Sequence, residues 1–349
     1  MHSFSLGVLG SVVGATLWVG PVRAELDVRF PKGTDCAVVV DLESICRLAP
    51  ETMGWIREGL VDAIEAYKWP KGRADEELAQ LDAVPEAINA KLQACGLQTK
   101  DLHWAAVGFG KVCFWNDMVS CTTNVDWELI LSVDHYDWDK IASFLKGKGV
   151  STQSDWLSDV PVKRFSRDRE YRMPKEGLVW GVQGHEGKCF FSSYPPKTWG
   201  LYEKGKDADP RYSEFGKLEK DEVVRIMVLG PDMPITDLSW SHLQPRVALV
   251  SIMHELRPHI SKLSREDFSI FWSRESFGAR LRLTWTDEAA ALAAEMVAKK
   301  TFTPEWILAD VSRVGTVVTV EAVRCPPSSF FRAFGKGILL DGLKELVLW

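Results

Sequence analysis

The sequence predicts an α+β protein made of two related lobes, each an antiparallel sheet with helices packed on one face, after a cleaved signal peptide. Three observations lead to this fold class. An apolar N-terminal run ends in a small-residue cleavage pattern, strands of period two lead twice into an amphipathic helix, and the 349 residues are enough for about two domains. The apolar content of 46% and the charged content of 26% are those of an ordinary globular chain.

Residues 1–24 are the predicted signal peptide. Their apolar run, Leu6 to Gly20, is shorter than the roughly 18 residues that a membrane-spanning helix needs, and a small-residue pattern follows it up to Ala24. We therefore expect cleavage after Ala24 and a periplasmic or extracellular protein. The alternative is an uncleaved N-terminal anchor, because Met1 to Ser5 contains no Lys or Arg.

The first predicted lobe spans residues 25–205. Its helices are expected where apolar residues recur at spacings of three and four, and Gly96 fits a C-terminal helix cap. The expected elements are strand 36–41, helices 51–67 and 75–95, a hairpin and helix within 102–148, a polar irregular stretch at 150–176, strands 178–183 and 188–193, and a short helix at 195–204.

The hairpin of this lobe is expected to turn around Asp117. That turn pairs Val107 with Trp127 and Phe109 with Val125, which places both apolar sets on one face of the sheet. The helix that follows carries its apolar residues on one side: Trp138, Ile141, Ala142 and Leu145.

The second predicted lobe spans residues 222–349 and follows a charged connection at 206–221. It repeats the order of strand, helix, hairpin and helix, so the two lobes are predicted to be related. The expected elements are strand 223–229, helix 248–256, a hairpin and helix within 264–300, strand 315–323, and a last helix at 328–343 after Pro326 and Pro327.

The second hairpin has a four-residue loop at 273–276. This loop pairs Phe268 with Leu281 and Ile270 with Ala279. Thr286 is the expected N-cap of the next helix. The apolar stripe expected on that helix consists of Ala289, Leu292, Ala293, Met296 and Val297.

The charge of the chain disfavours nucleic acid as a partner. The formal net charge is −6, and it becomes −7 in the mature chain because the signal peptide carries one Arg and no acid. After the signal peptide no stretch is long and apolar enough to predict a transmembrane helix.

The seven cysteines all follow the signal peptide, and export permits disulfides. Cys113 and Cys121 lie opposite each other in the hairpin register predicted above, so they are the candidate disulfide. No C-x-x-C occurs, which disfavours a zinc ribbon or a thioredoxin-type site. The pairing of the other five stays open: Cys36, Cys46, Cys95, Cys189 and Cys325.

Local motifs predict no catalytic, cofactor-binding or metal-binding residue. The chain has no G-x-S-x-G elbow and no Walker loop, and Gly108 and Gly110 are interpreted as strand glycines that let another element approach. The pair His254 and His259 has the wrong spacing for a zincin helix. Two further sets are interpreted as surface or helix-end residues: the acidic group Asp134, His135, Asp137 and Asp139, and the S-x-x-K pair Ser143 and Lys146.

Two compositional features remain. A basic stretch is interpreted as a solvated loop, with an anionic glycan or lipid surface as the alternative: Lys163, Arg164, Arg167, Arg169, Arg172 and Lys175. The chain also has 15 Trp. Four of them are expected in the core (Trp127, Trp138, Trp272 and Trp285), and seven have no assigned place: Trp55, Trp69, Trp115, Trp156, Trp199, Trp240 and Trp306.

These observations favour a non-enzymatic exported protein of the cell envelope that acts by binding or as a scaffold, with an envelope protein or a glycan as its partner. No cofactor is expected. One alternative is a secreted or periplasmic hydrolase whose catalytic residues are scattered along the chain. Another is a glycan-binding protein that uses exposed Trp faces.

Overall fold

The fold was obtained as a computed structural model. It describes residues 26, 28–110, 126–147, 150–157, 160–167, 178–183, 187–192, 208–229, 256–301, 309–322 and 324–332. The predicted signal peptide at 1–24 lies outside these residues.

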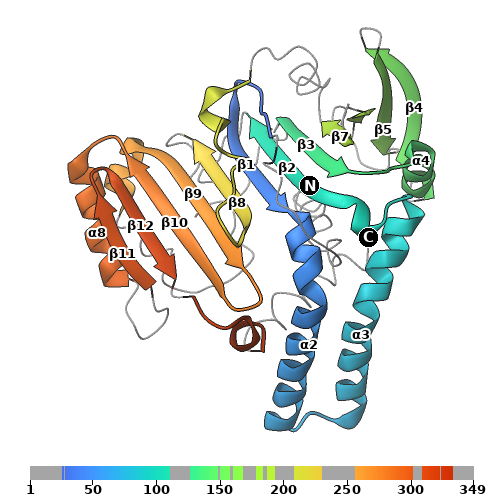
Figure 1. The fold of residues 1–349 in the computed structure, drawn as a ribbon, viewed down its shortest axis with the longest axis horizontal. Helices are drawn as coiled ribbons and strands as arrows, with labels where there is room; N and C mark the ends of the chain where they lie inside the picture. The colour runs from blue at the N-terminus through green and yellow to red at the C-terminus, as the bar shows by residue number, and fades with distance from the viewer. Residues whose placement is uncertain are drawn as a thin grey trace.

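In the described part of the chain, twelve strands form one sheet in which every neighbouring pair is antiparallel (Figure 1). The strand order is β11-β12-β10-β9-β8-β1-β2-β3-β7-β6-β5-β4. The strands are β1 (Thr34–Asp41), β2 (Leu102–Gly110), β3 (Asp126–Val133), β4 (Val150–Leu157), β5 (Val160–Arg167), β6 (Leu178–Gln183), β7 (Lys188–Ser192), β8 (Glu222–Leu229), β9 (Leu263–Trp272), β10 (Phe277–Trp285), β11 (Ala309–Val314) and β12 (Val317–Ala322).

Inside the sheet β1 pairs with β8, with Val38 opposite Ile226. Each of these strands comes from one of the two predicted lobes, so both lobes contribute to the same sheet. Outward from this pair the order is β1, β2, β3 on one side and β8, β9, β10 on the other. A helix follows β3 and another follows β10. The fold is therefore a mixture of helices with one large antiparallel sheet.

The longer helices are α2 (Leu42–Ala66), α3 (Lys71–Ala94), α4 (Trp138–Gly147) and α8 (Glu288–Thr301). Short 3₁₀ turns are η1 (Thr99–Asp101), η2 (Pro210–Tyr212) and η3 (Arg257–Lys262), and residues 327–332 form a further helical segment.

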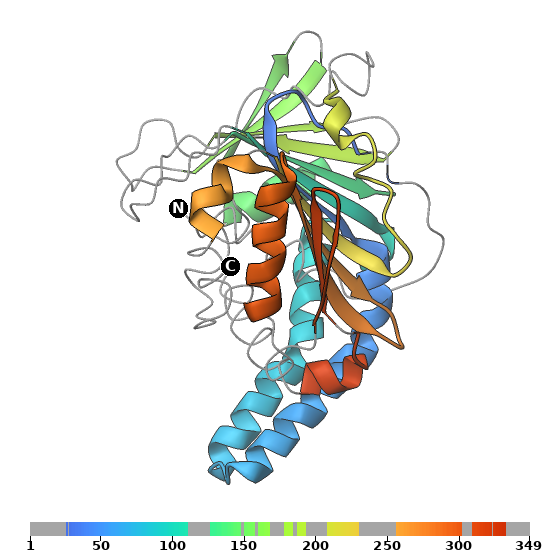
Figure 2. The same cartoon turned by 90° about the vertical axis from the view of Figure 1, so that its left-hand side faces the viewer.

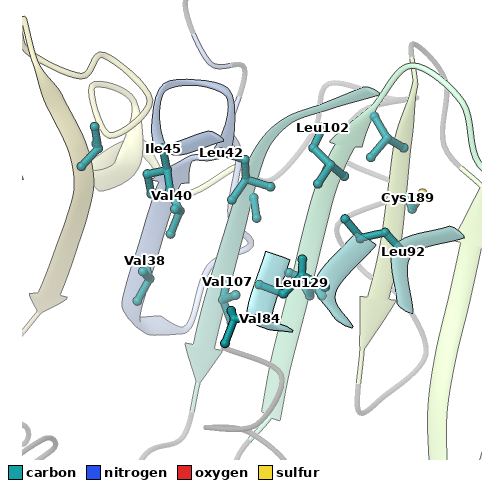
Figure 3. Packing of buried hydrophobic residues seen from close by; sticks show 14 residues of the cluster. Val38, Val40, Leu42, Ile45, Val84, Leu92, Leu102, Val107, Leu129 and Cys189 are labelled. Atoms are coloured by element: carbon teal, nitrogen blue, oxygen red, sulfur yellow. The ribbon is translucent and has the colours of Figure 1, made fainter. Parts of the chain in front are cut away.

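One face of the sheet packs against α2, α3 and α8. Val38, Val107 and Leu129 of the central strands form a core with Ile45 of α2 and Val84 of α3 (Figure 3). Across the sheet, residues of β10 on this same face form a second core with the alanines of α8. The hydrophobic core therefore lies mainly between the sheet and these helices.

The opposite face is covered by two segments that contain no strand of the sheet and no α-helix, around residues 28–30 and 209–215. Phe30, Tyr212 and Phe215 are buried there against Ala37 and Trp104, and the three rings contact one another edge-on. Much of the predicted charged connection at 206–221 thus packs onto the sheet (yellow in Figure 2).

The register predicted for the second hairpin is confirmed, since Phe268 faces Leu281 and Ile270 faces Ala279. The register predicted for the first hairpin is wrong by two residues, because Val107 faces Leu129 and Phe109 faces Trp127. A shift of two residues keeps every side chain on the same face, so alternation of apolar residues does not distinguish the two registers.

Of the apolar stripe predicted on α8, Val297 is partly buried against the core beneath the helix, but the two largest side chains are exposed. Leu292 and Met296 are 47% and 66% exposed, whereas the side chains buried against the sheet are small: Ala290, Ala291, Ala294 and Ala298. The bulk of this interface comes from Leu283 and Trp285 of β10. The N-cap is Asp287 rather than Thr286, since the Ala290 N–H donates to Asp287 Oδ1 at 2.8 Å.

Several boundaries also differ from prediction. α2 begins at Leu42 rather than at residue 51, and Pro50 lies within it. β4 and β5 occupy a stretch that was expected to be irregular, and β11 was not predicted. The strands expected at 36–41, 178–183 and 223–229 are confirmed, and so is the capping role of Gly96, which has a φ of 72°. None of the helices in the described ranges has the length and apolarity needed to cross a membrane.

Candidate functional site

The helical hairpin formed by α2 and α3 is the most prominent element outside the sheet. Both helices continue well beyond the sheet edge and end in a shared turn (Figures 1 and 2). α2 begins directly after β1, where Asp41 Oδ1 accepts a hydrogen bond from the Ser44 N–H at 2.9 Å. Leu60 of α2 and Leu81 of α3 are buried in one hydrophobic cluster, which also contains Phe331 of the segment 327–332.

The turn at the tip of the hairpin is a Schellman motif. The Lys68 N–H donates to the Glu65 carbonyl at 3.2 Å and the Trp69 N–H donates to the Ile64 carbonyl at 3.1 Å. Lys68 has a φ of 49°, which is the left-handed conformation that the motif requires after the C-cap. Ile64 and Trp69 both pack against this hydrophobic cluster, as the motif's hydrophobic contact demands.

We call residues 67–73 the hairpin apex. Tyr67 is 75% exposed, and the seven residues include three cations and no acid. The Arg73 guanidinium carbon lies 4.4 Å from the centroid of the Trp69 ring, a cation–π contact that orders both side chains. The apex therefore presents an aromatic side chain and positive charge on a convex end, which suits recognition of another molecule better than chemistry inside a cleft.

A second cluster lies at the root of the hairpin. His103 of β2 sits between two carboxylates: its Nε2 is 2.7 Å from Asp134 Oδ1 and its Nδ1 is 3.7 Å from Glu43 Oε2. Partial burial lowers the pKa of His103, but the two carboxylates outweigh burial and the pKa lies above its ordinary value. Two carboxylates beside its nitrogens favour the imidazolium form of the ring, and an imidazolium has no lone pair with which to act as a general base.

A row of charged side chains crosses β8, β9, β10 and β12. Arg225, Ser269, Arg280 and Glu321 occupy successive cross-strand positions on the face opposite α8. Arg280 lies 2.7 Å from Glu219 and 3.3 Å from Glu321. Partial burial raises the pKa of Glu219, but Arg280 outweighs this effect and holds the pKa below its ordinary range.

The anchor of this row is Glu222, whose side chain is 0% exposed. Its carboxylate accepts from Arg225 Nε at 2.8 Å, from Ser269 Oγ at 2.6 Å and from the Glu219 N–H at 2.7 Å. Because each charge has an opposite charge or a hydrogen-bond donor beside it, the row fastens residues 214–222 to the sheet and we assign it a structural role.

Three tryptophans near the α2–α3 hairpin have aromatic or cationic neighbours. Trp55 stacks on Phe331 with 6.4 Å between ring centroids, and Arg73 covers one face of Trp69. Trp272 packs against Phe277 and Phe331 in the same aromatic cluster. Trp115, Trp199, Trp240 and Trp306 lie outside the described residues.

Most sequence candidates prove to be structural where the structure describes them. A Cβ on Gly108 would lie 2.6 Å from the Phe30 ring, which confirms that this glycine permits a close approach. Asp137 caps α4 by accepting from the Asp139 and Lys140 N–H groups at 2.9 and 3.1 Å. Ser143 and Lys146 are exposed, as expected for the polar side of α4.

Other candidates are dispersed or lie outside the described residues. Lys163 of the basic stretch lies in β5 and donates to Asp139 at 2.7 Å. His259 is in η3, while His254 is outside the described residues, as are Cys113 and Cys121. In the described ranges no three His, Cys, Asp or Glu side chains are arranged to hold a metal ion.

Sequence reasoning missed both the apex and the His103 cluster. The apex could have been found, because Tyr67 to Arg73 combine two aromatic residues with three cations next to a helix break. The His103 cluster leaves no local signal, because Glu43 and Asp134 lie far from His103 in the sequence and meet it only in the folded sheet.

No model of a known protein family matches the chain, and no curated protein matches it. Among solved structures the chain is similar to crystal form III of TP0453, with a TM-score of 0.43, 9% identity, and coverage of 91% of this chain and 95% of that chain. It is also similar to crystal form IV of TP0453, with a TM-score of 0.42, 8% identity, and coverage of 89% and 98%. A likeness at these values assigns no function to the chain.

Proposed function

We propose that this chain is an exported, non-enzymatic protein of the cell envelope that acts by binding or as a scaffold, and that the hairpin apex makes the contact. The observation that carries the proposal is the exposed Tyr67 among three cations at the far end of α2 and α3. Tyr, Trp and Arg are the residue types most enriched in protein-recognition surfaces, and the apex has one of each. We expect an envelope protein as the partner.

Export is part of this proposal. It rests on the apolar run from Leu6 to Gly20 and on the small-residue pattern that ends at Ala24. The chain isolated from its host should therefore begin at Glu25. N-terminal sequencing or intact mass decides this point, and a protein that retains Met1 at its envelope location would instead favour the uncleaved anchor.

We also propose that the predicted lobes, 25–205 and 222–349, descend from one duplicated unit. The sheet order on the two sides of the β1 and β8 pair supports this origin, as does the helix that follows the third strand on each side. The test is an experimental structure of the full chain, in which β1, β2, β3 and α4 are superposed on β8, β9, β10 and α8. The duplication is rejected if α4 and α8 do not overlap once the three strands are aligned.

The binding role is tested by photo-crosslinking from a single position. Tyr67 is replaced by a photoreactive phenylalanine analogue in the full chain, and the cells are irradiated. Val314, at the β11–β12 turn, is 80% exposed and serves as the matched control. We expect a discrete adduct from position 67 that is lost when Lys71→Glu and Arg73→Glu are added, and none of that size from position 314. The same products from both positions, or none from position 67, would contradict the proposal.

A further inference from the structure

We propose that His103 is a pH-sensitive clamp that fastens the root of the α2–α3 hairpin to the sheet when its imidazole is protonated. Its Nε2 lies 2.7 Å from Asp134 Oδ1 and its Nδ1 lies 3.7 Å from Glu43 Oε2. The three residues come from β2, the end of β3 and the first turn of α2.

The three residues of the cluster lie where the two ends of the hairpin join the sheet. Glu43 is the second residue of α2, and His103 is the second residue of β2, which follows α3 through η1. Asp134 is held next to them because its N–H donates to the Asp101 carbonyl at 2.9 Å. The clamp therefore joins the beginning of the hairpin, the segment after its end, and the neighbouring strand.

Protonation decides whether both contacts exist. The charged groups that act on the ring are Asp134 and Glu43. An imidazolium donates from both nitrogens, whereas a neutral imidazole has one N–H and one lone pair. The neutral ring can keep its short contact with Asp134, but its other nitrogen then faces the Glu43 carboxylate with no proton between them. Deprotonation should therefore release the contact to α2 first.

The direction of the pH dependence follows from the raised pKa of His103. Partial burial opposes protonation, but the hydrogen bonds and charges of Asp134 and Glu43 outweigh it, so the folded-state pKa exceeds the ordinary value. A group with a raised pKa contributes stability that is fully present below the unfolded value of about 6.5 and is lost as the pH rises through the folded value. The clamp is therefore closed below about pH 6.5 and opens as the pH rises through the folded-state pKa of His103.

The clamp is tested on the full mature chain without any partner. The His103 imidazole is titrated by NMR, with its resonance assigned by its absence in His103→Asn. We expect its pKa to lie above about 6.5, and Glu43→Gln and Asp134→Asn should each lower it. A pKa at or below that value, or one that neither carboxyl variant changes, would overturn the clamp.

Hydrogen exchange gives a second readout that a merely structural histidine would not produce. Amides in the first two turns of α2 are compared between the wild type and His103→Asn at the same pH, which cancels the intrinsic pH dependence of exchange. Below neutral pH we expect the protection factors of the wild type to exceed those of the variant about two- to fivefold, which corresponds to the free energy of a half-exposed ion pair. Above the His103 pKa we expect the protection factors of the two proteins to converge. His135→Asn, one residue beyond Asp134 and exposed, is the control and should change nothing.

A role for the clamp in binding rests on the proposed function of the hairpin apex. The adduct from position 67 is therefore also compared at pH 6 and pH 8. The titration and the exchange can behave as expected while the adduct yield is the same at both pH values. That result supports the clamp and rejects its control of binding. If no adduct forms at either pH, the proposed function fails and the clamp is judged on the NMR and exchange results alone.

Discussion

Gly59 of α2 lies directly against the backbone of Arg332, so that a Cβ on Gly59 would overlap the Arg332 carbonyl oxygen. This approach brings Phe331 into the core formed by Ile56, Leu60 and Leu81. The segment 327–332 comes from the C-terminal part of the described chain, whereas α2 lies near its start. The glycine thus permits a backbone contact that accompanies the side-chain contacts of Phe331 and Arg332 with the hairpin.

Gly59→Ala should destabilise the protein, because α2 and the segment 327–332 must move apart to make room for the added Cβ. We expect a loss of about 2–4 kcal/mol, comparable to overpacking together with the loss of buried Phe331 contacts. Urea denaturation measures the change. Gly54→Ala on the same helix is the matched control, since its Cβ would meet nothing within 4 Å. The Gly54→Ala variant should raise the free energy of unfolding by about 0.5–1 kcal/mol, because alanine is more favourable than glycine inside a helix.

Lys68→Gly should stabilise the hairpin. Lys68 holds the left-handed conformation of the Schellman motif at a φ of 49°, and glycine adopts it without the cost that a side chain incurs there. We expect a gain of about 0.5–1 kcal/mol in the free energy of unfolding. Lys71→Gly, at the first position of α3, should instead have a neutral or unfavourable effect. Destabilisation by Lys68→Gly would mean that the Lys68 side chain makes a contact that outweighs the backbone strain.

Glu222→Gln should be strongly destabilising, since it leaves the charge of the largely buried Arg225 without its carboxylate. Breaking a buried pair in this way costs about 3–5 kcal/mol. The exposed pair Arg57 and Asp82, 3.0 Å apart, is the comparison. Asp82→Asn should change stability by no more than about 1 kcal/mol. Equal effects of the two variants in denaturant titrations would reject the structural role given to Glu222.

The thiols of Cys36 and Cys95 should react slowly with alkylating reagents. Burial, with smaller contributions from Glu266 and Asp35, raises the pKa of Cys36 to about 12, and burial raises the pKa of Cys95 to about 11. Only the thiolate reacts with iodoacetamide, so both residues should be modified slowly in the native protein at neutral pH. Peptide mass spectrometry measures the extent of modification at each site.

The predicted Cys113–Cys121 disulfide is tested by counting thiols after unfolding. Without reduction we expect five of the seven cysteines to react, and after reduction all seven. The double variant Cys113→Ser with Cys121→Ser should give five under both conditions. Seven reactive thiols in the unreduced wild type, isolated from an oxidising compartment, would exclude the disulfide.

The parts of the fold that the sequence predicts are those controlled by local chemistry. The loop at 273–276 is short, so it fixes the register of Ile270 against Ala279. Gly96 ends α3 because the left-handed conformation after the helix favours glycine. In both cases the residues that decide the structure are close together in the chain, so the local sequence is enough to predict the strand register and the helix end.

The parts that were missed depend on distant neighbours. The Leu292 and Met296 side chains of α8 look like a buried stripe, yet Trp285 beneath the helix fills so much space that alanines meet it instead. α2 continues through Pro50 because buried residues on both sides of the proline hold the helix. For the site, His103 meets Glu43 and Asp134 only after three separate segments have come together in the sheet.

The pairing of β1 with β8 has a consequence for how the chain acquires its structure. β1 ends at Asp41 and β8 begins at Glu222, so during synthesis one side of Cys36 to Val40 has no neighbour until most of the protein exists. An apolar strand with an open edge can pair with other chains, and closing so long a loop is slow. The nascent protein therefore passes through a stage in which its central strand is a template for aggregation. Binding of a chaperone to this strand until β8 arrives would raise the yield of folded protein.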